Sequence, residues 1–169
     1  MRLGRLLTAV LLVVAAAALQ TTLFARLRLF DTAPALVVLV VFALARHLPP
    51  EQAIVVGFLS GLLEDLLVES PLGLWALVLA SVAFAVVRLR GRLEDDFTLI
   101  APVVLIVSVG ALALFAVLGT IFNEKTLADS AFLRKMLLPA IYNTALAVIV
   151  LPAITRLLGA GRRRAPFEL

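Results

Sequence analysis

The chain has 169 residues, a formal net charge of +4 at pH 7, 63% hydrophobic residues and no cysteine. Its mean hydropathy is +1.15. Charged residues make up only 15% of the chain, whereas soluble domains carry about 25%. This composition excludes an ordinary soluble domain, disulfides and Cys-based metal or thiolate chemistry, and it predicts an all-α integral membrane protein.

Six apolar segments could each cross a bilayer, which takes about 20 residues of α-helix. We expect the first span to follow Arg2 and Arg5, although its small-residue stretch AAAALQ also fits a signal-peptide cleavage region. Asp31-Thr32 ahead of Pro34 fits the start of the second span, and Pro152 should kink the sixth or mark its final turns. All six belong to one transmembrane domain, residues 1–169. The expected spans are residues 6–23, 32–46, 52–68, 72–87, 99–122 and 137–158.

The distribution of basic residues predicts that both termini are cytoplasmic. With the N-terminus inside, most of the 15 Lys and Arg residues fall in inner segments. The clearest inner segment is the basic loop RLRGRLEDDF, which contains Arg88, Arg90 and Arg92. These clusters lie between apolar runs, as topology signals near anionic lipid do, so we expect a membrane and no nucleic acid as a partner.

The stretch GFLSGLLEDLLVESPLGLWAL combines small residues, three carboxylates and a helix break. Small residues four apart allow two helix backbones to approach closely in lipid. We expect this face to pack either against another span of this chain or against a partner's helix. On a helical wheel, the residues that share the face are Gly57, Ser60, Gly61 and Glu64, with Asp65 at its edge.

The carboxylates Glu64, Asp65 and Glu69 lie near the outer end of the third span. They are either the solvated end of the helix or, for charges still within the helical pattern, groups that need a partner. Carboxylates at a helix C-terminus oppose the helix dipole, so we expect a basic group to compensate them. The candidates are Arg26, Arg28, Arg134 and Lys135.

The residues that follow should set the path into the fourth span. Pro71 is expected to end one helix or start the next, and Gly73 to permit close packing at the start of that span. Trp75 lies near the outer end of the span, where Trp is usually an interfacial anchor.

Nothing in the sequence has the pattern of a catalytic, cofactor-binding or metal site. The only histidine, His47, has no Asp, Cys or His at ligand spacing, and no phosphate-binding loop is present. Glu64 and Asp65 point about 100° apart on a helix, which does not suit a shared acid–base pair. The best polar cluster within a span, Tyr142–Thr144, is expected to form hydrogen bonds between helices. We therefore do not expect an enzyme, and we expect no cofactor.

Taken together, these residues resemble the rod shape-determining protein MreD family. The family pattern is a helix with spaced glycines, an acidic residue at its end, and a Pro-Leu-Gly step into the next span. Here it reads Gly57, Gly61, Asp65 and Pro71–Gly73. Glu64 beside Asp65 is not part of that pattern.

This resemblance implies a multi-pass subunit of the bacterial inner membrane that works in the cell-elongation complex. Such proteins act with the bitopic protein MreC and, through it, with actin-like MreB and the cell-wall synthases that build lateral peptidoglycan. The family also looks similar in fold to the S-components of energy-coupling-factor transporters. That similarity leaves an alternative open, a substrate-binding membrane subunit of a small-solute, vitamin-type transporter. The scarcity of polar groups in the spans favours the first function.

Overall fold

The computed structural model describes residues 2–24, 26, 32–68, 70–92, 97–122 and 131–159, and these residues form six α-helices. Each helix overlaps one expected span, so the all-α membrane class is confirmed. Glu69 lies outside the described residues. The elements are α1 (Arg2–Leu19), the π-helical turn η1 (Gln20–Phe24), α2 (Leu36–His47), α3 (Pro50–Val68), α4 (Leu74–Leu89), the 3-10 turn η2 (Arg90–Arg92), α5 (Phe97–Ile121) and α6 (Phe132–Gly159).

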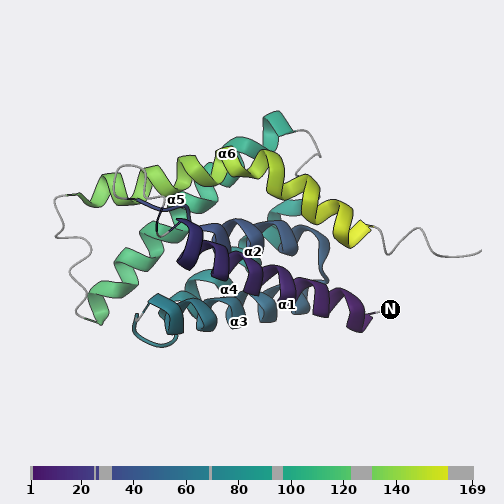
Figure 1. Cartoon of the computed structure of the whole chain (residues 1–169), viewed down its shortest axis with the longest axis horizontal. Coiled ribbons are helices and arrows are strands. Elements are labelled where there is room, and N and C mark those ends of the chain that lie inside the picture. The colour runs from purple at the N-terminus through teal and green to yellow at the C-terminus, as the bar shows by residue number, and fades with distance from the viewer. Residues whose placement is uncertain are drawn as a thin grey trace, which may run out of the picture.

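The bundle is organised around α2, which contacts all five other helices. Every residue of Leu36–Ala45 is buried, which explains why this segment is apolar on all sides. The α3–α4 pair lies on one side of α2 and the α5–α6 pair on the other, while α1 lies across α2 and α3 (Figure 1).

The second span begins later than the sequence predicts. α2 starts at Leu36, with Ala35 as its N-cap and no side-chain hydrogen bond from Ala35, rather than at Asp31-Thr32. Pro34 disfavours helical geometry at the residue before it, so the helix cannot readily extend upstream. With 12 residues, α2 is about 18 Å long, shorter than the roughly 30 Å hydrocarbon core, and it is shielded by its neighbours.

The outer surface of the bundle is apolar, as a surface facing lipid requires. Leu11, Ile106 and Ile149 are 68%, 69% and 70% exposed. Among the described residues, three helical segments are long and apolar enough to cross a membrane by themselves. These are Gly4–Phe24, Leu99–Ile121 and Phe132–Leu158.

The sixth helix is longer than expected and begins at Phe132 rather than at residue 137. Its first turn contains Arg134 and Lys135, which are exposed. A hydropathy boundary misses them because charged side chains can continue a helix beyond the apolar region. Pro152 lies inside α6, and Figure 1 shows that the helix changes direction in its C-terminal part.

Candidate functional site

The glycines of α3 lie directly against α4. A Cβ atom added at Gly57 would lie 2.7 Å from the carbonyl oxygen of Leu79 and 3.0 Å from the Cβ of Ala83. A Cβ added at Gly61 would overlap the backbone of Trp75 and Ala76. Such contacts leave no room for a larger residue, so the two helices form a tightly packed hairpin.

Ser60 lies on the same buried face and is 2% exposed. Its hydroxyl donates a hydrogen bond to the carbonyl of Val56, one turn earlier in α3, at 2.6 Å. This bond satisfies the hydroxyl within its own helix, so Ser60 contributes a small side chain to the hairpin without needing a polar partner on α4.

Asp65 supplies the N-terminal cap of α4 from the neighbouring helix. Its carboxylate is 1% exposed. It accepts hydrogen bonds from the backbone N–H groups of Gly73 and Trp75, both at 2.9 Å, and from that of Ala76 at 3.4 Å. The Ser70 hydroxyl also donates to it, at 2.6 Å. The first N–H groups of a helix have no partner within the helix and carry its positive dipole end, so they suit a carboxylate.

The hydrogen bonds of Asp65 that the structure describes come from groups other than the basic side chains that we expected, one of which, Arg28, lies outside the described residues. Among the described residues, the hydrogen-bond donors to its carboxylate are a hydroxyl and three backbone N–H groups. Asp65 lies at the C-terminal end of α3, where its own helix dipole is unfavourable. The N-terminus of α4 provides the compensating positive end.

The turn before α4 explains why a residue of the preceding helix, Asp65, caps α4. Gly73 is the N-cap residue of α4 and has φ of 96°, in the left-handed region. It has no side chain to cap the helix, and no atom lies within 4 Å of an added Cβ. Glycine is therefore used here for its backbone conformation, not for the close packing that we expected. Pro71 lies in the turn between the helices, and its carbonyl accepts a hydrogen bond from the N–H of Leu74 at 3.1 Å.

Glu64 points to a different helix and is also buried, with 4% exposure. Its Oε1 accepts a hydrogen bond from Nε2 of Gln20 in η1. The other end of that amide, Oε1 of Gln20, accepts from the backbone N–H of Val37 in the first turn of α2, at 3.2 Å. Glu64 thus holds, through Gln20, the start of α2, while its neighbour Asp65 holds the start of α4.

A small cavity adjoins Glu64. Its volume is about 180 Å³, and Gln20, Glu64 and Trp75 are among the residues that line it. Oε2 of Glu64 and Nε1 of Trp75 have no hydrogen-bond partner among the described residues. These two polar atoms are buried without a partner, next to a cavity that their side chains help to line. No group of three His, Asp or Glu side chains in the described part of the chain could hold a metal ion.

Trp75 is not an interfacial anchor in this structure. It is only 8% exposed and stacks on Phe115 of α5, with ring centroids 4.4 Å apart and planes at 25°. The ring therefore joins the α3–α4 hairpin to α5.

Asn143 connects α6 to the centre of the bundle and is fully buried. Its Nδ2 donates to the carbonyl of Ala35 at 2.9 Å and to the Ser108 hydroxyl of α5 at 3.1 Å. Thr144 donates only to Ala140 in its own helix. Of these two polar neighbours in α6, Asn143 is the one whose hydrogen bonds link different helices.

The basic residues at the end of α4 and in η2 also make contacts within the bundle. Nη1 of Arg90 donates to the carbonyl of Leu48 at 2.6 Å and to that of Ala45 at 3.4 Å, and so caps the C-terminal end of α2. The guanidinium of Arg88 lies 5.1 Å from the centroid of the Phe84 ring. Arg92 ends η2, and its side chain is outside the described part of the structure.

Sequence reasoning singled out Glu64 and Asp65 but missed Gln20 as a member of the site. Gln20 lies 44 residues before Glu64, and only the fold brings them together. A polar residue at the end of an apolar span was the one available signal, and it equally fits a solvated helix end.

Comparison with known proteins gives one match. The family model of the rod shape-determining protein MreD matches residues 1–159. No curated protein and no solved structure matches, and the similarity to transporter S-components stays a prediction. The matched region contains the glycine pair, both buried carboxylates and the turn at Gly73. The chain therefore belongs to the rod shape-determining protein MreD family.

Proposed function

We propose that this protein is a non-catalytic, multi-pass subunit of the bacterial inner membrane that binds an MreC-like bitopic protein. Through that partner it would help regulate lateral-wall peptidoglycan synthesis by the cell-elongation complex, together with MreB-like actin and the wall synthases. The observation that carries the proposal is the family match over residues 1–159. The apolar helices and their apolar outer surface support a place in the membrane.

A non-catalytic role agrees with how the buried polar groups are used. Asp65 accepts its hydrogen bonds from the start of α4, Glu64 binds Gln20, and Asn143 binds two other segments. Each of these contacts joins separate elements of the bundle. These side chains support a rigid scaffold that presents its surfaces to partners.

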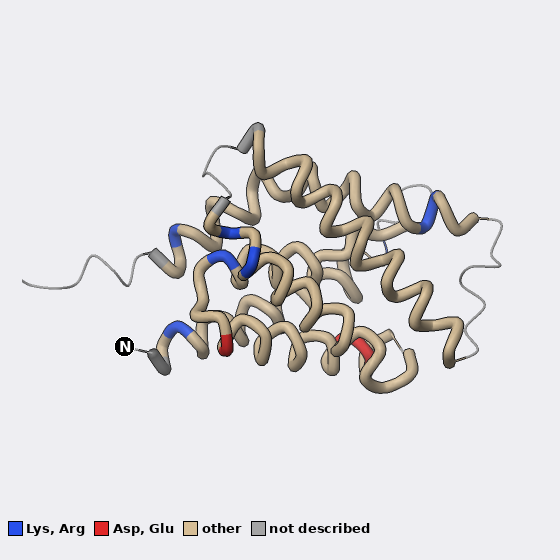
Figure 2. Tube along the Cα trace, turned by 180° about the vertical axis from the view of Figure 1, so that it is seen from behind, with Lys and Arg blue, Asp and Glu red and all other residues tan. Residues whose placement is uncertain are grey.

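The distribution of charge supports cytoplasmic termini. Figure 2 shows that most of the described Lys and Arg residues gather at the end of the bundle where the N-terminus lies. The last turns of α2, α4 and α6 contribute Arg46, Arg88 and Arg156 to that end. An excess of Lys and Arg marks the cytoplasmic side of inner-membrane proteins.

The packing of the hairpin bears on where a partner would bind. The glycine face of α3 is occupied by α4, so an MreC-like span would pack on another surface. In this proposal, the hairpin residues affect partner binding only indirectly, because they set the angle and distance between α3 and α4. These residues are Gly57, Ser60, Gly61, Asp65 and Gly73.

The test is depletion of the protein in its native host, with fluorescent D-amino acids as a label for wall synthesis. We expect depleted cells to lose rod shape and lateral incorporation of the label, and we expect the wild-type chain to restore both. Depleted cells that keep rod shape and lateral labelling would overturn the proposal.

The small-solute transporter alternative has weaker physical support. A cavity of about 450 Å³ between α2, α5 and α6 is large enough for a small ligand, but most of its described lining residues are apolar. The cavity beside Glu64, about 180 Å³, is smaller than the roughly 300–1,000 Å³ typical of pockets for drug-sized ligands. A vitamin-sized molecule would have to separate helices that hydrogen bonds hold together there. Solute uptake that depends on this chain, with no effect on cell shape, would favour the alternative.

A further inference from the structure

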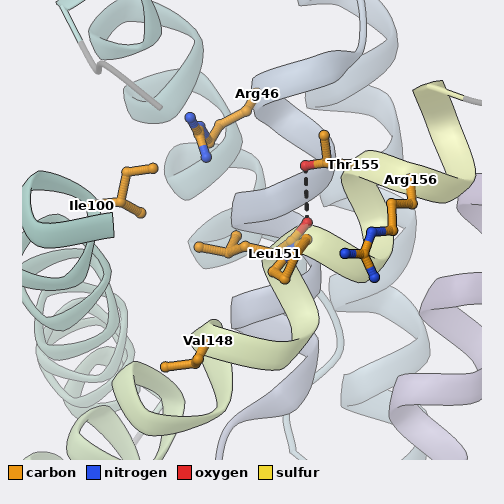
Figure 3. A pocket seen from close by; sticks show the side chains of 7 residues that line it. Arg46, Ile100, Val148, Leu151, Thr155 and Arg156 are labelled. Carbon is orange, nitrogen blue, oxygen red and sulfur yellow. Dashed lines mark hydrogen bonds between the residues drawn. The ribbon is translucent and has the colours of Figure 1, made fainter. Parts of the chain in front are cut away.

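A second, larger cavity lies at the basic end of the bundle, between α2, α5 and α6. Its volume is about 450 Å³. The family match assigns nothing to it, and it is remote from Glu64 and Asp65, which lie at the opposite end of α3. The lining residues are Arg46, Ile100, Val148, Leu151, Pro152, Thr155 and Arg156 (Figure 3).

The cavity has an apolar wall and a basic rim. Ile100, Val148 and Leu151 provide hydrocarbon surface from α5 and α6. Arg46 and Arg156, in the last turns of α2 and α6, are both among the lining residues. The cavity therefore pairs an apolar surface with positive charge.

The floor between the two arginines is held in place by hydrogen bonds. Thr155 donates to the carbonyl of Leu151 at 2.9 Å, the bond drawn in Figure 3. Nε2 of His47 lies 3.1 Å from the same Thr155 hydroxyl and ties the end of α2 to α6. This link connects the two helix ends that carry Arg46 and Arg156.

The cavity is open toward the lipid-facing side of α6. Val148 lines it and is 55% exposed, and the adjacent Ile149 is 70% exposed. A ligand seated at the rim can therefore continue along an apolar helix surface. A small, fully polar ligand would gain nothing from contact with this apolar wall.

We propose that this cavity binds an anionic phospholipid. The phosphate accepts hydrogen bonds from the guanidinium groups of Arg46 and Arg156, which suit phosphate oxygens through paired N–H donors. The first part of an acyl chain lies against Ile100, Val148 and Leu151. Basic pockets between helices on the cytoplasmic side are suited to anionic head groups. This inference goes beyond the proposed function and does not depend on it.

The experiment is native mass spectrometry of the purified, delipidated chain titrated with phosphatidylglycerol or with phosphatidylethanolamine. We expect wild type to retain phosphatidylglycerol about thirtyfold more tightly, because two basic residues at roughly 1 kcal/mol each contribute about 2 kcal/mol to binding an anionic head group. The variant Arg46→Gln/Arg156→Gln should lose this preference. The matched control Arg134→Gln/Lys135→Gln changes two basic residues at the opposite end of α6 and should keep it.

A second variant keeps the proposal testable if the arginine variant does not fold. Val148→Phe leaves both charges in place, narrows the cavity and should weaken phosphatidylglycerol binding. Competition with glycerol 3-phosphate separates the sources of the phosphate: a lipid site should resist millimolar competitor, whereas full displacement would mean a site for a free anion and overturn the proposal. Equal retention of both lipids by wild type, or an unchanged preference in the Gln variant, would also overturn it.

Discussion

The carboxylate of Asp65 accepts a hydrogen bond from the backbone N–H of Trp75 at 2.9 Å, ten residues further along the chain. This contact joins the end of α3 to the first turn of α4. Because Gly73 at the N-cap position has no side chain, the residue that caps α4 comes from the preceding helix. The positive N-terminal end of the α4 dipole thereby compensates the Asp65 carboxylate for its unfavourable place at the negative C-terminal end of the α3 dipole.

Asp65→Asn should destabilise the hairpin. The amide keeps one acceptor oxygen but turns an NH₂ donor toward backbone N–H groups. We expect a loss of about 2 kcal/mol in the free energy of unfolding, as for hydrogen bonds to a charged group. The loss can be measured by unfolding in mixed detergent micelles. Glu51→Gln, in the exposed first turn of α3, is the control and should cost less, because an exposed carboxylate near a helix N-terminus contributes only about 0.3–1 kcal/mol. Equal stability of both variants would contradict the capping role.

Gly61→Ala should disrupt the hairpin more than Gly57→Ala. The new methyl group at residue 61 overlaps backbone atoms of α4, which cannot move aside as a side chain can, whereas at residue 57 the closest atom is 2.7 Å away. Overpacking of this kind costs about 1–3 kcal/mol or more, and Gly61→Leu should abolish function. Rod-shape complementation and membrane protein level are the readouts. Gly110→Ala, with nothing within 4 Å, is the matched control. Normal growth with Gly61→Leu would show that the close contact is not needed.

Gly73→Ala should destabilise the protein through its backbone and not through a clash. Its φ of 96° is unfavourable for residues with a Cβ, by about 1–2 kcal/mol. Asn tolerates this region better, so Gly73→Asn should recover part of the loss. Thermal unfolding in detergent, with Gly91→Ala as the control, measures the order wild type, Asn, Ala. The opposite order of Asn and Ala would contradict the left-handed turn.

Gln20 and Glu64 should be energetically coupled. Gln20→Leu removes the acceptor for Val37 and the donor to Glu64, and Glu64→Leu removes a carboxylate that no longer needs a partner in the double variant. We expect a coupling energy of about 1 kcal/mol in a double-mutant cycle followed by unfolding in mixed micelles. Gln20→Leu combined with Glu51→Leu should be additive. Additivity in both cycles would argue against the network.

Asn143→Ala should be more harmful than Thr144→Ala. Asn143 joins α6 to Ala35 and Ser108, whereas Thr144 donates to its own helix. Hydrogen bonds between helices in a membrane contribute about 1 kcal/mol, so the Asn143 variant should unfold at lower denaturant. Comparable midpoints for the two variants would contradict a connecting role for Asn143.

Local pattern was enough to anticipate much of this fold. Long apolar runs located the helices, and helical periodicity put Gly57, Ser60, Gly61 and Glu64 on one face, all of which are buried. Periodicity cannot specify which helix a face meets. It also left the partners of the two carboxylates open, because their donors come from backbone N–H groups and from Gln20, which only the folded bundle brings close.

Helix ends were harder to locate than helix centres. The start of α2 depends on Pro34 and on side chains from η1 and α6 that bind Val37 and Ala35. The start of α6 includes charged residues that hydropathy places outside the membrane. In both cases, contacts between distant segments decide where the helix begins, and single-sequence hydropathy contains no information about them.

The measurement that tests the central claim most directly is purification of the tagged chain from its native membranes in mild detergent, followed by identification of the proteins that accompany it. The account predicts recovery of an MreC-like bitopic protein with wild type and with Gly110→Ala, and its loss with Gly61→Leu at matched protein level. Recovery of ATPase subunits with a coupling membrane protein, and of no MreC-like protein, would contradict the account.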